Sequence, residues 1–388
     1  MASTKTNPRV AILLNYIPPY RLPFFKILAA KIGDLTFLLS TRMEPNRPWD
    51  AHWEGLNVIL QHNIMIRTSS HHPEGFTDTL YIHLPYDTLA HLVRRRPDVV
   101  VSLELGFRTL QAFIYRLVFR SSRLIIWVPL SERTEQGHGG MRTILRRMIL
   151  RNADAILVNG ASGARYITQF GIPAQRIFTV PYTTDVGLFC SIPLFRNPEV
   201  SRKLLFIGQL IDRKGLIPFL CVLIRWCGLH GNQKVEFRVV GDGPVKSQLA
   251  GMILPENLTL ILEGNTEYTE MPGYYTNAGL FVFPSLADEW GLVVNEAMLA
   301  GLPVLGSVYS QAVEEIVEDG VNGWKFTPDD SQSTLRAIDL AFGASRADLD
   351  RMRTQARVSA EKFSPEFAAG QVLAAIHSTG CANFPDRY

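Results

Sequence analysis

The chain has 388 residues, of which 47% are hydrophobic and 19% are charged, and its formal net charge is +3. This is the composition of an ordinary globular protein with two or three domains, and so small a positive charge gives no argument for a nucleic-acid partner. No apolar run reaches the length of a signal-peptide core or a membrane span, and the four cysteines have no metal-site spacing. We therefore expect a cytoplasmic protein with no bound metal.

Short apolar runs alternate with helical patterns along the whole chain. In the first half we expect strands at 10–14, 35–39, 99–103, 124–128, 155–158 and 176–180, and helices at 22–32, 86–94, 107–119, 140–151 and 161–169. In the second half we expect strands at 203–208, 235–240, 259–263, 280–283 and 303–307, and helices at 214–229, 244–252, 270–277, 292–300, 311–318, 331–343 and 347–362. This alternation predicts βαβ units and parallel sheets with helices on both faces.

The pattern restarts after a stretch near residue 190 that has two prolines and little periodicity, which is typical of a linker. We expect an α/β protein of two doubly wound, Rossmann-like domains, at 1–190 and 191–365, followed by a C-terminal helix in 366–388 that crosses back to the N-terminal domain. Ligands of open parallel sheets bind beyond the carboxyl ends of the strands. The cleft between the two domains is therefore the expected site, and the residues that follow each strand are its candidates.

The loop after the expected strand 203–208 reads GQLIDRKGL and carries two adjacent cations, Arg213 and Lys214, near a helix start. Gly208 allows the backbone to come close to a ligand. Cations beside the free N–H groups of a helix N-terminus suit a diphosphate, although a solvated basic loop would have the same sequence. The next loop, GDGPVKSQL, lacks the third glycine of a G-x-G-x-x-G motif, so no nicotinamide-dinucleotide fingerprint is present.

The stretch 284–301, PSLADEWGLVVNEAMLAG, places Glu296 inside an apolar helix, eight residues after Asp288. A buried carboxylate is costly unless hydrogen-bonded, and a ribose diol would supply two hydroxyl donors. Eight residues of helix span about 12 Å, which is comparable to the ribose-to-sugar distance in a nucleotide sugar. Glu296 could equally pair with a nearby cation while Asp288 caps the helix. The N–H groups near Gly291, Leu292 and Val293 are candidates for phosphate binding.

These segments resemble the family 4 retaining glycosyltransferases, which have the GT-B fold. DEWGLVVNEAMLAGLPVLGS is similar to the donor-site signature of that family, an acid followed after seven residues by a glutamate and then by A-M-x-x-G-x-P-V. FIGQLIDRKGL, VVGDGP and YYTNAGLFVFPS resemble further family segments in the same order, and NYIPPYRLPFF resembles the first-strand loop of one branch. The resemblance covers most of the chain and is more specific in its second half.

The resemblance implies a role for each matching residue. Lys214, with the polar group of Gln209, would bind the donor diphosphate, and Arg213 would compensate for the charge that Gln209 lacks. Glu296 would bind the ribose, and Asp288 the transferred sugar, near the backbone amides of Trp290 to Leu292. It also implies a hexose-type sugar from a UDP-, GDP- or ADP-sugar as co-substrate, with no other cofactor. Two departures stand out: Gln209 replaces the usual arginine, and Asp288 replaces a glutamate and is followed by Glu289, which is the alternative sugar-contacting acid.

The first domain is expected to bind the acceptor, a glycan, a lipid-linked molecule or a small molecule. Tyr20 and Arg21 follow the first strand and are the candidate acceptor contacts, or else they form a structural turn. Helix 140–151, GMRTILRRMILR, has an apolar face and four arginines. Such a helix either lies on the surface of an anionic membrane, which for a cytoplasmic protein is the inner face of that membrane, or packs against the protein core with its basic side in solvent.

Two other functions remain open at this stage. A nucleotide-sugar epimerase of GT-B-like fold would convert the donor without any acceptor. A non-catalytic relative would only bind a nucleotide or glycan. The nucleotide base, the sugar, the acceptor and the oligomeric state do not follow from the sequence.

Overall fold

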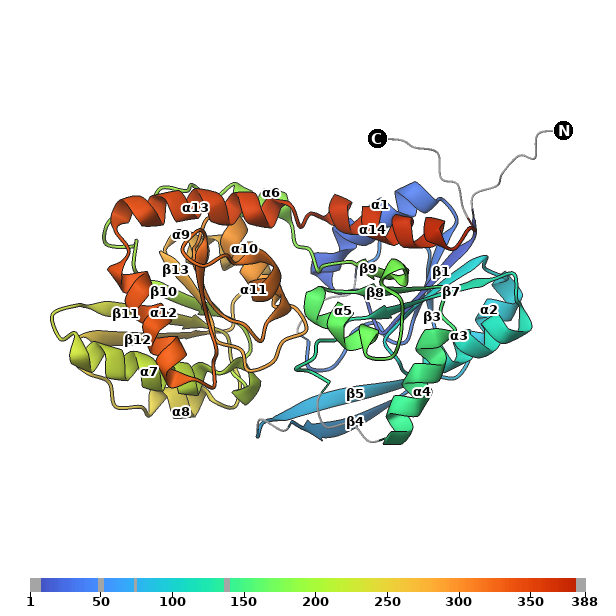
Figure 1. Cartoon of the computed structure of the whole chain (residues 1–388), viewed down its shortest axis with the longest axis horizontal. Coiled ribbons are helices and arrows are strands. Elements are labelled where there is room, and N and C mark those ends of the chain that lie inside the picture. Colours follow the sequence, from blue (N-terminus) through green and yellow to red (C-terminus); the bar gives the residue numbers. More distant parts are fainter. Residues whose placement is uncertain (1–7, 48–51, 73–74, 136–139, 382–388) are drawn as a thin grey trace. The chain divides into compact units, whose positions relative to one another are not determined.

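The computed structural model describes residues 8–47, 52–72, 75–135 and 140–381. The chain divides into two compact units of α/β structure (Figure 1). Unit 1 comprises Met1–His72, Asp78–Thr183 and Pro365–Tyr388, and unit 2 comprises Pro73–Thr77 and Thr184–Ser364.

Unit 1 is built on a seven-stranded parallel sheet with the strand order β3-β2-β1-β6-β7-β8-β9. Its strands are β1 (Val10–Leu14), β2 (Leu35–Leu39), β3 (Val58–Leu60), β6 (Val99–Leu103), β7 (Arg123–Val128), β8 (Ala155–Val158) and β9 (Ile177–Thr179). The order reverses between β1 and β6, so that the loops after these two strands diverge. Such a topological switch point is the usual ligand site of an open parallel sheet.

Helices cover both faces of this sheet. The 3₁₀ turn η1 (Pro19–Arg21) leads into α1 (Leu22–Ile32), which packs with α14 (Pro365–Ser378) in the core on one face. The other face carries α2 (Thr88–Arg95), α3 (Phe107–Val118), α4 (Gly140–Arg151) and α5 (Ala161–Thr168), which share a second core with the sheet. The turn η2 (Ala174–Arg176) precedes β9. The C-terminal helix α14 thus belongs to unit 1 (Figure 1).

Unit 2 has a six-stranded parallel sheet with the order β12-β11-β10-β13-β14-β15. Its strands are β10 (Leu204–Ile207), β11 (Val235–Val240), β12 (Leu258–Gly264), β13 (Leu280–Phe283), β14 (Val304–Ser307) and β15 (Gly323–Phe326). Its helices are α6 (Val186–Cys190), α7 (Leu216–Leu229), α8 (Lys246–Ala250), α9 (Met271–Thr276), α10 (Leu292–Leu299), α11 (Gln311–Ile316), α12 (Ser331–Gly343) and α13 (Arg346–Glu361), with 3₁₀ turns η3 (Asp212–Lys214) and η4 (Tyr268–Glu270). The switch point lies between β10 and β13.

The structure differs from the sequence prediction in three places. The two-stranded sheet of β4 (Asn63–His71) and β5 (Thr77–Pro85) was not predicted, and neither were the short strands β3 and β15. The units divide at Thr183, seven residues before the predicted boundary, because residues 186–190 form α6, which belongs to unit 2. Phe189 of α6 is buried against the ring of Tyr275, with 5.4 Å between the ring centroids, and this contact joins the segment to unit 2.

None of the helices in the described residues combines the length and apolar content that a bilayer crossing needs.

Candidate functional site

The candidate site lies at the switch point of unit 2, where the loops after β10 and β13 meet. Gly215 has φ +66°, and a Cβ there would lie 2.1 Å from the carbonyl oxygen of Pro284, so only glycine allows the two loops to approach this closely. The loops are also hydrogen-bonded, because Leu286 N donates to the carbonyl of Arg213 at 2.8 Å. The cations of the first loop are thereby held against the second.

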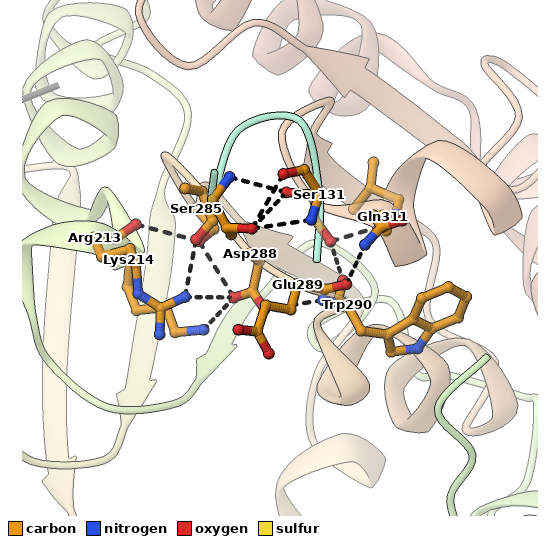
Figure 2. A network of polar contacts seen from close by, with 12 residues as sticks. Ser131, Arg213, Lys214, Ser285, Asp288, Glu289, Trp290 and Gln311 are labelled. Atoms are coloured by element: carbon orange, nitrogen blue, oxygen red, sulfur yellow. Dashed lines mark hydrogen bonds and ion pairs between the residues drawn. The ribbon is translucent and has the colours of Figure 1, made fainter. Parts of the chain in front are cut away.

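Asp288 is the centre of a charged cluster (Figure 2). Its Oδ2 accepts a short hydrogen bond from Lys214 Nζ and lies 3.7 Å from Arg213 Nη1, and Ser285 Oγ is 3.4 Å from the same oxygen. Asp288 is 8% exposed. Burial by itself would raise its pKa, but the charges of Lys214 and Arg213, with the hydrogen bonds from Lys214 and Trp290 N, hold it below the usual value. Asp288 is therefore ionised at neutral pH.

The acid loop is fixed to the start of the next two helices. Asp288 N donates to the carbonyl of Tyr309 at 3.2 Å, and Ser310 Oγ donates to the carbonyl of Trp290 at 2.5 Å. Gly291 has φ +100°, and a Cβ would lie 2.7 Å from Phe283 and 2.8 Å from Ser310 Oγ. A glycine is thus required where the chain enters α10. Glu289, the alternative acid, is exposed, whereas Asp288 lies against the cations.

Glu296 lies in the second turn of α10 and is 4% exposed. Its Oε2 accepts a hydrogen bond from Tyr275 OH at 2.9 Å, and its Oε1 accepts one from Thr184 Oγ1 at 3.3 Å. Burial raises the pKa of Glu296 to about 7, and these two hydrogen bonds oppose the shift. The nearest partners of this carboxylate are thus neutral hydroxyls, not the cation that the alternative sequence interpretation required.

The remaining predicted donor residues lie at the start of α10 and directly after β10. Leu292 and Val293 open α10, and their N–H groups have no partner within the helix because α-helical bonds reach back four residues. Gly208 and the exposed Gln209 directly follow β10. Trp290 has a buried indole whose Nε1 donates to Asn295 Oδ1 at 2.8 Å, and its backbone N–H donates to Asp288 Oδ1 at 3.3 Å. Its amide is therefore engaged in shaping the loop.

The predicted acceptor residues lie in unit 1, after β1. Tyr20 is half-buried, but Arg21 is only 6% exposed. The guanidinium carbon of Arg21 lies 4.5 Å from the ring centroid of Trp127 and 4.7 Å from that of Tyr182, and the rings of Phe24 and Phe25 lie within 6 Å. Such stacking stabilises a buried guanidinium, so Arg21 holds the loop in place and does not present its charge to solvent.

A second polar cluster lies at the switch point of unit 1. Glu104 has a left-handed backbone with φ +65°, which is strained for a residue with a side chain. Asn15, directly after β1, donates to its carboxylate at 3.1 Å, and Arg108 Nη2 lies 3.5 Å from Oε2. Glu104 N donates to the carbonyl of Trp127 at 2.7 Å. Backbone and side chain are thus both constrained, in the loop where this kind of sheet binds ligands.

This second cluster was only partly predictable from the sequence. Glu104 and Asn15 follow strands that were predicted, so their position near the switch point could be inferred from the order of the strands. Arg108 is buried and bonds to Asn15, and no spacing indicated that pairing. Thr184 and Tyr275, the partners of Glu296, likewise had no sequence signal. No group of three or more potential metal-ligating side chains occurs in the part of the chain that the structure describes.

The chain is similar to known proteins in its sequence and in its fold. Residues 195–358 match the family model described as Glycosyl transferases group 1. The putative colanic acid biosynthesis glycosyltransferase WcaL of Salmonella typhimurium is 26% identical over 246 residues, which are 60% of this chain and 58% of WcaL. The sulfoquinovosyl transferase SQD2 of Arabidopsis thaliana is 34% identical over 204 residues, 50% of this chain and 38% of SQD2. The chain thus spans less than two thirds of the length of these curated relatives.

Among solved structures, the chain is similar to HepE of Anabaena in complex with UDP, with a TM-score of 0.70 and 16% identity over 95% of this chain and 100% of HepE. At this identity the likeness shows the fold alone. The GT-B fold and the resemblance to glycosyltransferases that the sequence predicted are confirmed.

Proposed function

We propose that the protein is a retaining, metal-independent glycosyltransferase, and the match of residues 195–358 to the family model described as Glycosyl transferases group 1 supports this. It moves a hexose-type sugar from a nucleotide sugar to an acceptor with a free hydroxyl group. The observation that supports this proposal is the cluster of Lys214, Arg213 and Asp288 at the switch point of unit 2, directly before α10 and Glu296. A cytoplasmic location is part of the proposal.

Lys214 and Arg213 bind the donor diphosphate, together with the first N–H groups of α10. Both cations are held by contacts within the site: Arg213 Nη1 donates to the carbonyl of Ala287 at 3.0 Å, and Lys214 donates to Asp288. A guanidinium has five N–H donors and an ammonium three, so both can bond phosphate oxygens as well. Fixed cations and a helix N-terminus stabilise the charge of a leaving diphosphate, which is the task that a metal ion performs in other transferases.

Glu296 binds the ribose of the nucleotide. An ionised carboxylate has about four acceptor positions, and Tyr275 and Thr184 occupy one on each oxygen. The remaining positions can accept hydrogen bonds from the two hydroxyls of a ribose. Burying a carboxylate among apolar residues costs folding free energy, and a role in binding ribose explains why one is present here.

In the proposed reaction, Asp288 accepts hydrogen bonds from hydroxyls of the transferred sugar and holds it in place. The oxygen of the acceptor hydroxyl attacks the anomeric carbon on the face from which the diphosphate leaves. The bond between that carbon and the phosphate oxygen breaks, and the acceptor proton passes to the departing phosphate. The acceptor binds to unit 1, where Tyr20 and the strained, half-exposed Glu104 are its proposed contacts.

The test measures release of nucleoside diphosphate in the presence of EDTA, with UDP-, GDP- and ADP-sugars and a crude glycan and lipid extract. Release with one donor is expected for the wild type and for Glu289→Gln, and it should be lost in Asp288→Asn. Proton NMR of the product should show the anomeric configuration of the donor. Inverted configuration, a requirement for a divalent cation, or activity that depends on Glu289 instead of Asp288 would each contradict the corresponding part of the proposal.

A further inference from the structure

The charges of the chain are separated between its two units. Unit 1 contains 23 Lys and Arg against 13 Asp and Glu, whereas unit 2 contains 16 against 23. The formal net charge of +3 therefore divides into +10 for unit 1 and −7 for unit 2. The small net charge of the chain is thus the sum of one strongly basic and one acidic unit. A charge of +10 attracts anionic partners over a distance of about one Debye length, roughly 8–10 Å.

One face of the sheet of unit 1 is covered by helices that carry basic but no acidic residues. The four helices that cover this face, α2, α3, α4 and α5, contain nine arginines and neither Asp nor Glu. We call this surface the basic face. Figure 1 shows these helices within unit 1, and they share one apolar core with the sheet below them.

Several arginines of the basic face are paired, and others are not. Arg116 and Arg146 bond Asp154 and Glu135. Among the described residues, however, no carboxylate forms an ion pair with the exposed Arg94, Arg147 or Arg151, nor with Arg120 just after α3. Arg151 Nε donates to a backbone carbonyl, that of Phe170, at 3.2 Å. These guanidinium groups are available to an external anion.

Large apolar side chains lie exposed among these arginines. On α4 the exposed ones are Ile144, Leu145 and Met148, with Ile144 72% exposed. At about 100° per residue, Ile144, Met148 and Arg151 project within about 60° of one another, while Ile149 and Leu150 on the opposite side are buried. On α3 the outward side chains Ile114, Leu117 and Val118 are likewise exposed. Contiguous exposed apolar side chains on a soluble surface usually mark an interaction site.

We propose that the basic face docks on a phospholipid bilayer with anionic headgroups. An amphipathic helix with arginines beside apolar side chains has the composition of helices that lie in the membrane interface. A nucleic acid or an acidic protein would match the arginines, but neither would bury Ile144, Met148 and Leu117 in an apolar phase. The proposal goes beyond the transfer reaction and does not depend on it.

The experiment is sedimentation of the full chain with vesicles of phosphatidylcholine, alone or with 30% phosphatidylglycerol, at low and high salt. We expect binding only to the anionic vesicles and its loss at high salt. The charge variant is Arg120→Glu with Arg147→Glu, and the apolar variant is Ile144→Asn with Met148→Asn. Each surface arginine contributes about 1 kcal/mol to binding an anionic bilayer, so removing two should weaken binding at least about thirtyfold, and the apolar variant should weaken it as well.

The matched controls carry one charge reversal and one apolar-to-asparagine substitution on unit 2, the acidic unit. Arg225→Glu on α7 and Leu340→Asn on α12 change exposed residues far along the chain from the basic face. Both controls should bind vesicles as the wild type does, and all variants should keep the wild-type circular dichroism spectrum. Equal binding to neutral and anionic vesicles, absence of vesicle binding, or an effect of the controls as large as that of the variants would overturn the proposal. Loss of binding in the charge variant alone, with displacement by RNA, would assign the face to a polyanion instead.

Discussion

The buried carboxylate of Glu296 predicts opposite effects of one substitution on stability and on binding. In the unfolded chain this group titrates near 4.5, and burial raises its pKa in the folded protein to about 7. The difference of roughly 2.5 units corresponds to about 3 kcal/mol. Because the folded-state pKa is raised, this stabilising contribution is fully present below pH 4.5 and is lost as the pH rises through 7.

Glu296→Gln removes this titration while keeping the shape of the side chain. Relative to the wild type, the variant should therefore gain stability as the pH rises, by about 3 kcal/mol between pH 4.5 and pH 8. The amide oxygen still accepts one of the two hydroxyl donors, Tyr275 or Thr184, so no large compensating loss is expected. Other titrating groups are common to both proteins and cancel in the difference.

Nucleotide binding should change in the other direction. A hydrogen bond to a charged partner contributes about 1.5–3 kcal/mol, so Glu296→Gln should weaken nucleoside diphosphate binding by roughly tenfold to a hundredfold. Between pH 6 and pH 8 the affinity should rise more steeply in the wild type than in the variant, because Glu296 ionises only in the wild type. The second ionisation of the ligand's terminal phosphate, at a pKa of about 6, acts equally on both proteins.

The assay is urea unfolding at pH 4.5, 6, 7 and 8, with isothermal titration of UDP, GDP and ADP at the three higher pH values. Glu289→Gln, an exposed glutamate in the loop before α10, serves as the control and should change neither quantity. A stability difference that does not vary with pH would refute the buried-carboxylate argument. Unchanged nucleotide affinity in Glu296→Gln would refute the ribose assignment.

Two further predictions concern the loop after β10. Lys214→Ala should weaken nucleoside diphosphate binding about tenfold to a hundredfold and leave nucleoside binding nearly unchanged; equal losses in calorimetry would contradict the diphosphate role. Gly215→Ala should lower the free energy of unfolding by more than 3 kcal/mol, since a Cβ there would overlap the carbonyl of Pro284. Gly320→Ala is its control, because Gly320 has a similar φ of +73° and open space around it, so that only about 1 kcal/mol should be lost in denaturant titrations.

The central strands of both sheets could be predicted because they are buried on both faces. Val10–Leu14 consists of five apolar residues, all buried, which is typical of a parallel strand covered by helices on each side. The strands β4 and β5 could not be found in this way. Ile64, Met65 and Ile66 of β4 are consecutive and all exposed, so no alternation between a buried and a solvated face marks the strand.

The part of the site that lies in the loops directly after predicted strands could be predicted from the sequence. Lys214 and Asp288 each follow a strand at a predicted edge of the sheet, and the structure brings them into contact. The partners of Glu296 were beyond such reasoning: Thr184 lies 112 residues away in sequence and Tyr275 lies 21 residues away. Hydroxyl groups that reach a site through tertiary packing leave no periodic trace in the sequence.

The two carboxylates of the candidate site, Asp288 and Glu296, have pKa shifts of opposite sign, and this difference separates their proposed roles. Asp288 stays ionised because Lys214 and Arg213 neutralise it, whereas Glu296 has only hydroxyl partners. When a diphosphate binds, the two cations must be shared between its oxygens and Asp288. Their hold on the Asp288 carboxylate weakens, and its oxygens become available to the sugar hydroxyls of the same donor. Of these two carboxylates, Glu296 is therefore the one that gives donor binding a pH dependence near neutrality, since the pKa of Asp288 is held below its usual value.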